Sequence, residues 1–353
     1  MPVTIAPLVT AQSQFLGGRG YLAACTVGLP PRAVRDAVIA DVAASAAGRP
    51  DPASYSALVE RSRGHFARLV GVATDRVAIG SQVSPFAALV AAALPDGAEV
   101  LAPEGDFSSV VLPFVHAGRG IHVRTVPLED LAAEIRRDTA LVAFSLVQSA
   151  TGDVADVDAI VDAARRHGAR TFCDATQAVG WLPVDATMFD ALVCHAYKWL
   201  CAPRGVAFLA VTREFARDIP SLFAGWYAGD DPWSSCYGTD VVLAGDARRL
   251  DVSPAWQAFV GAEPALALFA GLEREALYAH ATGLAAAFRY RLGLDQPERA
   301  SAIVTWADPD GCDVARLTAA GITASGRAGR ARVAFHVFND EDDVDLACAA
   351  LGR

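Results

Sequence analysis

Lys198 and Asp174 are the two residues of this chain whose surroundings most clearly suggest chemistry. Lys198 lies in the run 193–205, Val-Cys-His-Ala-Tyr-Lys-Trp-Leu-Cys-Ala-Pro-Arg-Gly, among aromatic, apolar and small residues. Because burying an ammonium group is costly, a lysine in this setting is a candidate for covalent reaction with a carbonyl. Asp174 ends an apolar run upstream. An acid at one strand end and a lysine just past the next strand are what a Schiff-base cofactor with a pyridinium nitrogen needs.

Each of the two residues also has a simpler structural interpretation. Asp174 could cap a short helix over 175–180, and Lys198 could lay its aliphatic chain along apolar surface with its ammonium in water. Because Asp174 and Lys198 occur together, a shared role in binding a cofactor is favoured over these two separate structural roles. His195, Tyr197 and Arg204 flank the lysine, and they indicate a phosphate neighbourhood more than an ordinary surface.

The elements that would position these residues alternate along the middle of the chain. Short apolar runs follow one another with helical periods between most of them, which is typical of a doubly wound α/β domain. We expect strands at Val77–Ile79, Val100–Ala102, His122–Thr125, Ala140–Ser145, Arg170–Cys173, Ala191–Cys194 and Val206–Val211. We expect helices at Pro85–Ala93, Val110–Ala117, Leu128–Arg136 and Asp156–His167. Ligands bind at strand carboxyl ends in such sheets, which is where Asp174 is expected.

The C-terminal third is predicted to form a smaller α/β domain. It follows the segment 223–249, a long aperiodic stretch rich in Gly, Trp, Tyr and Ser that we expect to be a functional or connecting loop. Its expected elements are a helical region from Trp256 to about Tyr290 broken near Glu263-Pro264, strands at Ala302–Trp306 and Arg332–His336, and helices at Val314–Ala320 and Glu341–Leu351. We therefore divide the chain into a large domain at 15–249 and a small domain at 250–353, with the segment 1–14 packing near the latter.

Composition and charge narrow the class of protein. The chain has 353 residues, of which 53% are apolar and 20% charged, as in ordinary globular proteins. Its net charge of −10 and the scatter of its basic residues argue against a nucleic-acid or membrane partner. No apolar run is long enough to span a membrane, and no leader segment is evident. The seven cysteines form no CxxC pair, so we expect no metal site and a reduced, cytoplasmic protein.

Three motifs give a more specific indication. Asp174-Ala-Thr-Gln177, His195-Ala-Tyr-Lys198 and Pro203-Arg-Gly205 resemble the class V aminotransferase family of pyridoxal-phosphate enzymes, which includes cysteine desulfurases, isopenicillin N epimerase and kynureninases. The resemblance extends from about residue 20 to the C-terminus. It implies pyridoxal 5′-phosphate as the cofactor, held by Lys198 as an aldimine, and a homodimer with active sites at the interface. It also implies fold type I, the aspartate-aminotransferase-like α/β fold with a large doubly wound mixed sheet and a smaller C-terminal α/β domain.

The resemblance assigns further residues to the cofactor. Asp174 would keep the pyridine nitrogen protonated, and Phe107 would stack on the ring, although a core aromatic is an equal alternative. The turn containing Ser81, Gln82 and Val83 precedes a helix whose N–H groups can hold a phosphate; an ordinary turn capped by Ser84 is compatible with this. The remaining candidates are Gln148, Ser149 and Gln177 for the phenolic oxygen, His195 and Tyr197 for the phosphate, and Ser253 for the phosphate bound in the partner subunit.

Two residues are assigned to the substrate. Arg332 begins the run 332–339, which resembles the family motif whose arginine binds the substrate α-carboxylate as a planar, bidentate donor. Cys25 lies in a stretch that often borders the substrate, although free cysteines are more commonly packed small residues. Cysteine desulfurases carry a nucleophilic cysteine on a loop upstream of this arginine. The stretch 319–329 has none, and Cys312 lies further back, so persulfide chemistry is disfavoured.

These observations predict a pyridoxal-phosphate enzyme acting on an α-amino acid, in which Lys198 moves the Cα proton. Transamination and β-elimination of the C–S lyase type rank first, because neither needs the missing cysteine. A kynureninase-like hydrolase, an epimerase and a non-catalytic scaffold of the same fold are the alternatives. The glycine-rich run 17–20 is only a weak indication of a nicotinamide enzyme. The aromatic residues of 223–249 are expected to shape the pocket for the substrate side chain.

Overall fold

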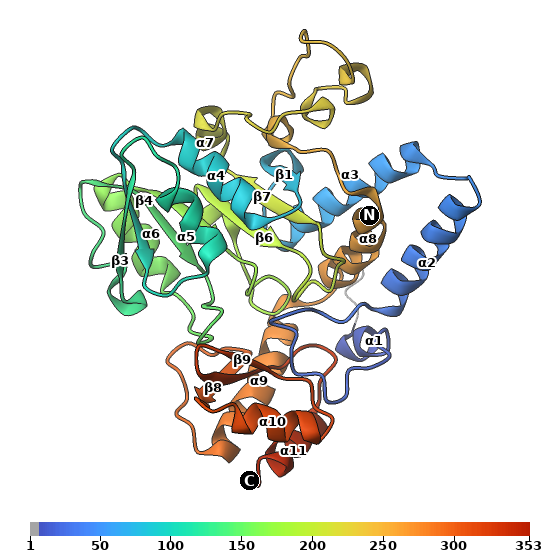
Figure 1. Ribbon diagram of the computed structural model, residues 1–353, viewed down its shortest axis with the longest axis vertical. Helices are drawn as coiled ribbons and strands as arrows, with labels where there is room; N and C mark the ends of the chain where they lie inside the picture. The colour runs from blue at the N-terminus through green and yellow to red at the C-terminus, as the bar shows by residue number, and fades with distance from the viewer. Residues whose placement is uncertain (1–6) are drawn as a thin grey trace.

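A seven-stranded mixed sheet forms the centre of the computed structural model, which describes residues 7–353 (Figure 1). The strand order is β1-β7-β6-β5-β4-β2-β3. β7 runs antiparallel to both of its neighbours, and the other neighbouring pairs are parallel. The strands are β1 (Val77–Gly80), β2 (Glu99–Pro103), β3 (His122–Val126), β4 (Thr139–Ser145), β5 (Arg170–Asp174), β6 (Ala191–His195) and β7 (Ala207–Val211). The predicted doubly wound sheet and its seven strands are confirmed.

Helices cover both faces of this sheet with their apolar residues. They are α3 (Pro52–Leu69), α4 (Val83–Ala93), α5 (Ser108–Val115), α6 (Val157–His167), α7 (Arg213–Asp218) and α8 (Trp256–Ala270). α4, α5 and α7 contribute to the core on one face, and α3, α6 and α8 to the core on the other. Successive residues of a strand point into opposite cores. In β1, Ala78 packs in the core with α4, α5 and α7, whereas Val77 and Ile79 pack in the core with α3, α6 and α8. Because both faces are buried, the strands are continuous apolar runs, which made them recognisable in the sequence.

The C-terminal part of the chain forms a second, antiparallel sheet, seen at the bottom of Figure 1. Its order is β8-β10-β9, and its core includes Phe288, Trp306 and Phe335. The elements are α9 (Arg274–Leu292), β8 (Ile303–Ala307), α10 (Cys312–Ala319), β9 (Ser325–Arg327), β10 (Arg330–Ala334) and α11 (Glu341–Ala350). β10 is the central strand of this sheet, and its Arg332 reaches the segment after β4, where it donates to Ser149 Oγ at 3.1 Å.

The N-terminal segment touches the C-terminal elements and the loop after β6. It contains α1 (Leu8–Gln12) and α2 (Arg32–Ala46), and residues 1–6 of the predicted segment 1–14 lie outside the described residues. Phe15 packs on Phe338 with ring centroids 5.0 Å apart, and the Gly20 N–H donates to Asp343 at 2.6 Å. Further on, the Gly28 N–H donates to the carbonyl of Tyr197 at 2.9 Å. The segment therefore links the C-terminal elements to the loop that carries Lys198.

Two predicted helices differ from the structure. The stretch expected as a helix at Leu128–Arg136 forms only a short 3₁₀ turn at Leu128–Asp130 and then further turns. Leu131 and Ile135 are nevertheless buried, so turns bury the apolar positions that suggested a helix. The predicted break near Glu263-Pro264 is wrong: α8 continues through Pro264 to Ala270, and α9 begins at Arg274. Buried apolar residues of α8 on both sides of the proline, including Phe259 and Phe269, hold the helix together.

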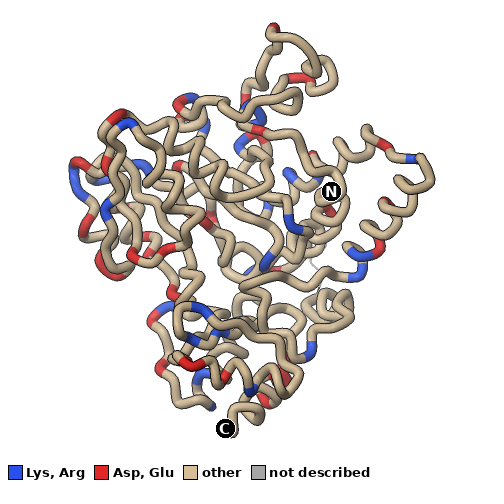
Figure 2. The backbone as a smooth tube through the Cα atoms, in the orientation of Figure 1, with Lys and Arg blue, Asp and Glu red and all other residues tan. Residues whose placement is uncertain are grey.

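The charged residues are distributed over the whole molecule. In Figure 2 the positions of Lys and Arg residues are interspersed with those of Asp and Glu along the backbone, without a continuous basic stripe. Within residues 7–353, no helix is long and apolar enough to cross a membrane. In the same residues, no group of His, Cys, Asp and Glu side chains is arranged to hold a metal ion.

Candidate active site

A cavity opens where the carboxyl ends of β4, β5 and β6 meet the first turns of α4 and α5. The space between its walls, including the part open to solvent at its mouth, is about 600 Å³. Such crevices at strand carboxyl ends are where doubly wound sheets bind ligands. The lining residues are Gln82, Val83, Ser84, Phe107, Ser109, Ser145, Ser149, Asp174, Thr176, Gln177, His195, Tyr197, Lys198 and Arg204.

Lys198 lies on the loop after β6 and is only 6% exposed. Burial lowers its pKa to about 8, although Asp174 and Cys25 oppose this effect. The Nζ atom lies 5.3 Å from the centre of the Phe107 ring and 5.8 Å from that of Tyr197. Lys198 is also the only lysine in the chain, a signal in the composition that sequence reasoning missed. A buried amine with a lowered pKa is suited to attack a carbonyl.

The backbone around Lys198 is held from several sides. The Cys201 N–H donates to the Lys198 carbonyl at 3.0 Å, and Cys201 has a φ of 55°, an unfavourable conformation for a residue with a side chain. His336 donates from Nε2 to the Trp199 carbonyl at 2.8 Å. A Cβ atom on Gly28 would stand 2.0 Å from the Lys198 carbonyl oxygen, so only glycine permits this close approach. These contacts fix the loop that presents the lysine.

Asp174 ends β5 and is 4% exposed. Its Oδ1 accepts the Thr176 N–H at 2.8 Å. Burial raises its pKa to about 6, and hydrogen bonds from Thr176 and the charge of Lys198 act in the opposite direction. A buried carboxylate of this kind gains most from a neighbouring positive charge, such as that of a protonated ring nitrogen.

Phe107 stands at the start of α5 with 44% of its surface exposed, on the cavity wall. The residue before it, Asp106, fixes this wall to the end of β4. Asp106 accepts hydrogen bonds from the Ser145 N–H at 2.7 Å, from the Ser145 hydroxyl at 2.5 Å and from the Gln148 amide at 3.2 Å. The sequence analysis did not identify Asp106. The only feature that could have indicated it is its place directly before the aromatic Phe107, shortly after the end of β2.

Three residues predicted near a phenolic oxygen have different environments. Gln177 and Ser149 line the cavity, and the Gln177 amide donates to Ser149 Oγ at 3.1 Å and to the Cys25 carbonyl at 2.9 Å. The Gln177 Oε1 accepts from the Trp199 indole at 2.8 Å. Gln148 does not line the cavity, because its amide turns toward Asp106. Gln177 therefore joins the N-terminal segment, the lysine loop and β4's following turn.

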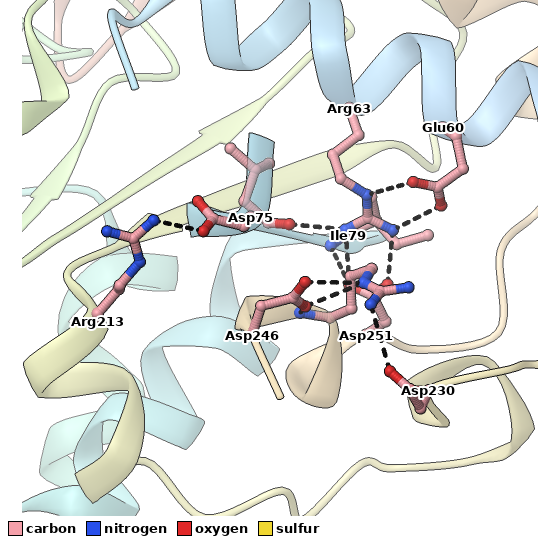
Figure 3. Close-up of polar contacts among 10 residues, drawn as sticks. Glu60, Arg63, Asp75, Ile79, Arg213, Asp230, Asp246 and Asp251 are labelled. Carbon is pink, nitrogen blue, oxygen red and sulfur yellow. Dashed lines mark hydrogen bonds and ion pairs between the residues drawn. The ribbon is translucent and has the colours of Figure 1, made fainter. Parts of the chain in front are cut away.

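The first turn of α4 faces the cavity with its N–H groups free of side-chain caps. Gln82 and Val83 line the cavity, whereas Ser81 does not. A buried ion pair fixes β1 before this turn: Arg63 and Asp251 lie 2.7 Å apart and are at most 1% exposed. Figure 3 shows Asp251 between Arg63 and the Ile79 N–H, which it accepts at 2.7 Å. The pair holds the pKa of the Arg63 guanidinium above its usual value, so this anchor stays charged.

His195 and Tyr197 line the cavity beside each other, with ring centroids 4.4 Å apart. Burial, Arg204 and Lys198 together lower the pKa of His195 to about 4, so its imidazole is neutral at neutral pH. Its Nε2 atom is buried and has no hydrogen-bonding partner among residues 7–353. Unpaired buried nitrogens are uncommon in folded proteins, and this one is suited to bind a ligand atom.

Arg332 and Cys25 lie next to the cavity and do not line it. Arg332, which is 1% exposed, donates to the Ser149 carbonyl, to Ser325 Oγ at 3.1 Å and to Thr26 Oγ1 at 2.8 Å. Burial lowers its pKa, and the Cys25 thiol opposes this effect. The hydrogen-bond acceptors of Arg332 are thus all uncharged, and a bound carboxylate could take the place of some of them.

Ser253 lies away from these residues. Its hydroxyl accepts a hydrogen bond from the Trp226 indole at 3.2 Å, and it does not line the cavity. Its predicted contact with a phosphate in the partner subunit stays a prediction.

The cavity fits a group that carries an aldehyde, a basic ring nitrogen and a phosphate. Lys198 offers an amine for the aldehyde, and Asp174 a buried carboxylate for the ring nitrogen. The uncapped first turn of α4 and the unpaired His195 Nε2 offer donors for an anion.

Comparison with known proteins agrees with this chemistry. A family model described as aminotransferase class V matches residues 51–305. An uncharacterized aminotransferase, YcbU of Bacillus subtilis, is 29% identical over 227 residues, which are 59% of this chain and 58% of that protein. A probable cysteine desulfurase of Aeropyrum pernix is 35% identical over 176 residues, which are 45% of this chain and 43% of that protein. The chain thus spans about half the length of the curated relatives that it matches.

The fold has a counterpart among solved structures. The cysteine desulfurase CsdA of Escherichia coli superimposes with a TM-score of 0.84 over 99% of this chain and 98% of that chain. The two sequences are 19% identical, so this likeness concerns the fold alone.

Proposed function

The chain belongs to the class V aminotransferase family, and from this membership we propose that it is an enzyme that breaks a bond at Cα of an α-amino acid. Its fold is fold type I, and its cofactor is pyridoxal 5′-phosphate, as the sequence motifs predicted. The observation that carries the proposal is the buried pair of Lys198 and Asp174 in one cavity, each with a pKa displaced by burial. Such displaced pairs are typical of catalytic sites.

Four residues in and beside the cavity have roles in this proposal. Lys198 would hold the cofactor covalently through its aldehyde carbon; the substrate amine would take its place there, and the freed Nζ would accept the Cα proton. Asp174 keeps the ring nitrogen protonated, and Phe107 packs on the ring. When bound, the cofactor supplies an acceptor for the electron pair left at Cα. Arg332 binds the substrate α-carboxylate by exchanging its hydrogen bonds with Ser149 and Thr26 for stronger, charge-assisted ones.

We place transamination or β-elimination of the C–S lyase type ahead of other reactions. Both need a single base, and Lys198 is the only amine among the residues that line the cavity. The desulfurase reaction has weaker support, because 319–329 lacks a cysteine and Cys312 is exposed at the start of α10, outside the cavity lining. Kynureninase-like hydrolysis and epimerisation are the next alternatives. A non-catalytic scaffold would not need the Lys198–Asp174 pair.

Products from a panel of amino acids test this proposal. The purified protein, loaded with pyridoxal phosphate, is incubated with each amino acid, with and without a keto acid as acceptor. Pyruvate and ammonia from cysteine or cystine without an acceptor indicate elimination, whereas exchange of amino and keto groups only with an acceptor indicates transamination. Racemised substrate, or alanine with released sulfur, would instead refute the proposed reaction class.

The assembly and location of the enzyme are further parts of the proposal. A homodimer is supported by the exposed aromatic and apolar residues of 223–249, among them Trp233, Tyr237 and Val242. A large domain at 15–249, a small domain at 250–353 and a cytoplasmic location are consistent with the two sheets and the seven free cysteines. Light scattering of the purified protein measures its molar mass and so tests the homodimer directly. A monomer under assay conditions would refute the proposed dimer.

A further inference from the structure

Arg204 is a charged residue of the cavity that has no partner of opposite charge. Its guanidinium lies over the Tyr197 ring, 4.9 Å from the centroid. Among residues 7–353 it forms no ion pair, although other exposed arginines do; Arg213, for example, lies 2.5 Å from Asp75. Because an arginine remains protonated in proteins, Arg204 brings a permanent positive charge to the cavity wall.

The other lining residues cannot supply this charge. Besides Arg204, the only cationic group among them is Lys198, which is committed to the aldehyde and is balanced by Asp174. His195 is neutral at neutral pH, and burial raises the pKa of Tyr197, so its phenol is also neutral. A phosphate monoester carries a charge of about −1.5 to −2 at neutral pH. Arg204 is therefore the cavity's only free charge for neutralising such a group.

The hydrogen-bond donors beside Arg204 suit the same ligand. The helix α4 has 11 residues and no side-chain cap, and its first-turn residues Val83 and Ser84 line the cavity. His195 is 93% buried, and its Nε2 has no partner within the described residues. Backbone N–H groups at a helix start and a planar guanidinium are both common phosphate ligands. Three independent elements thus present donors without acceptors to one cavity.

We propose that Arg204 binds the phosphate of pyridoxal 5′-phosphate, together with the first turn of α4 and the Nε2 atom of His195. The Tyr197 ring, whose centroid lies 4.9 Å from the Arg204 guanidinium carbon, helps to hold the guanidinium by a cation–π contact. This inference rests on the proposed function, because it assigns one end of the cavity to the cofactor and leaves Arg332 for the substrate.

Binding of two cofactor forms tests this assignment without measuring activity. The apo-protein is titrated with pyridoxal phosphate and with pyridoxal, which lacks the phosphate, and the dissociation constants are read from the absorbance of the bound form. Replacing Arg204→Gln should weaken pyridoxal phosphate binding by about tenfold or more and leave pyridoxal binding within about twofold. Arg204→Lys keeps the charge and should recover part of the loss. Arg213→Gln, a matched exposed arginine away from the cavity, should bind both forms as the unmodified protein does.

The outcomes separate this inference from the function on which it rests. Equal dissociation constants for pyridoxal phosphate in Arg204→Gln and the unmodified protein would overturn the assignment of Arg204 alone. A variant with unchanged cofactor binding and a raised KM only for acidic substrates would assign Arg204 to a substrate anion, which also overturns it. Failure of the unmodified protein to bind pyridoxal phosphate would overturn both.

Discussion

The titration of Lys198 depends on its burial and on Asp174. With a pKa of about 8, about 9% of the Lys198 amine is neutral at pH 7. A solvated lysine with a pKa of about 10.4 is about 0.04% neutral at that pH, so burial raises the reactive fraction about 200-fold. Asp174 raises the pKa of Lys198 from within the same cavity. Replacing Asp174→Asn removes this charge, and the midpoint should move below 8.

Reductive methylation of the apo-protein with formaldehyde measures this midpoint. The rate of modification is followed between about pH 6 and about pH 11, and the peptide that contains Lys198 is quantified by mass spectrometry. Because Lys198 is the only lysine, no other side-chain amine interferes. Asp162→Asn, a change at an exposed carboxylate on α6, is the matched control and should leave the midpoint unchanged. A midpoint near that of a solvated lysine, or an upward shift in Asp174→Asn, would refute the reasoning.

Two further changes test how the site is held. Gly28→Ala should lower activity by about 100-fold, because a methyl group would meet the Lys198 carbonyl at 2.0 Å and displace the lysine; Gly17→Ala, which adds a methyl group in open space, should be neutral in the same assay. Equal activity of the two variants would show that the close approach of Gly28 to the Lys198 carbonyl is not needed for activity. Asp251→Asn should reduce the free energy of unfolding by about 1.5–3 kcal/mol in urea denaturation, because the buried Arg63 then keeps only the half-exposed Glu60, at 3.0 Å, as an acidic partner; a loss below about 1 kcal/mol would contradict the role of the Arg63–Asp251 ion pair.

The sequence predicted the large sheet and the core of the site for one physical reason. Strands buried on both faces are short apolar runs, and a polar residue at the end of such a run is conspicuous. Asp174 and Lys198 were found in this way, and the structure brings both into one cavity. The helix α2 was missed because it buries only Val34 and therefore lacks a clear apolar stripe. The helix α3 was missed because the polar residues Ser62 and Arg63 interrupt its buried face.

Contacts between distant segments were beyond the reach of sequence patterns. Asp106 reaches the end of β4, and Gly28 approaches the lysine loop, through pairings that only the fold creates. Gln148 was expected near the cofactor, but its amide binds Asp106 instead. The turn at Leu128–Asp130 buries nearby apolar residues without a helix, since tertiary packing overrides periodicity.

Trapping of the cofactor on the chain tests the central claim most directly. The protein is incubated with pyridoxal phosphate, reduced with borohydride, digested and analysed by mass spectrometry, alongside a Lys198→Ala variant with verified folding. We predict one stoichiometric phosphopyridoxyl group on the peptide that contains Lys198, and none in the variant. A modification confined to the N-terminal amine, or equal labelling of the variant, would contradict the assignment of Lys198 and the proposed chemistry of the cavity.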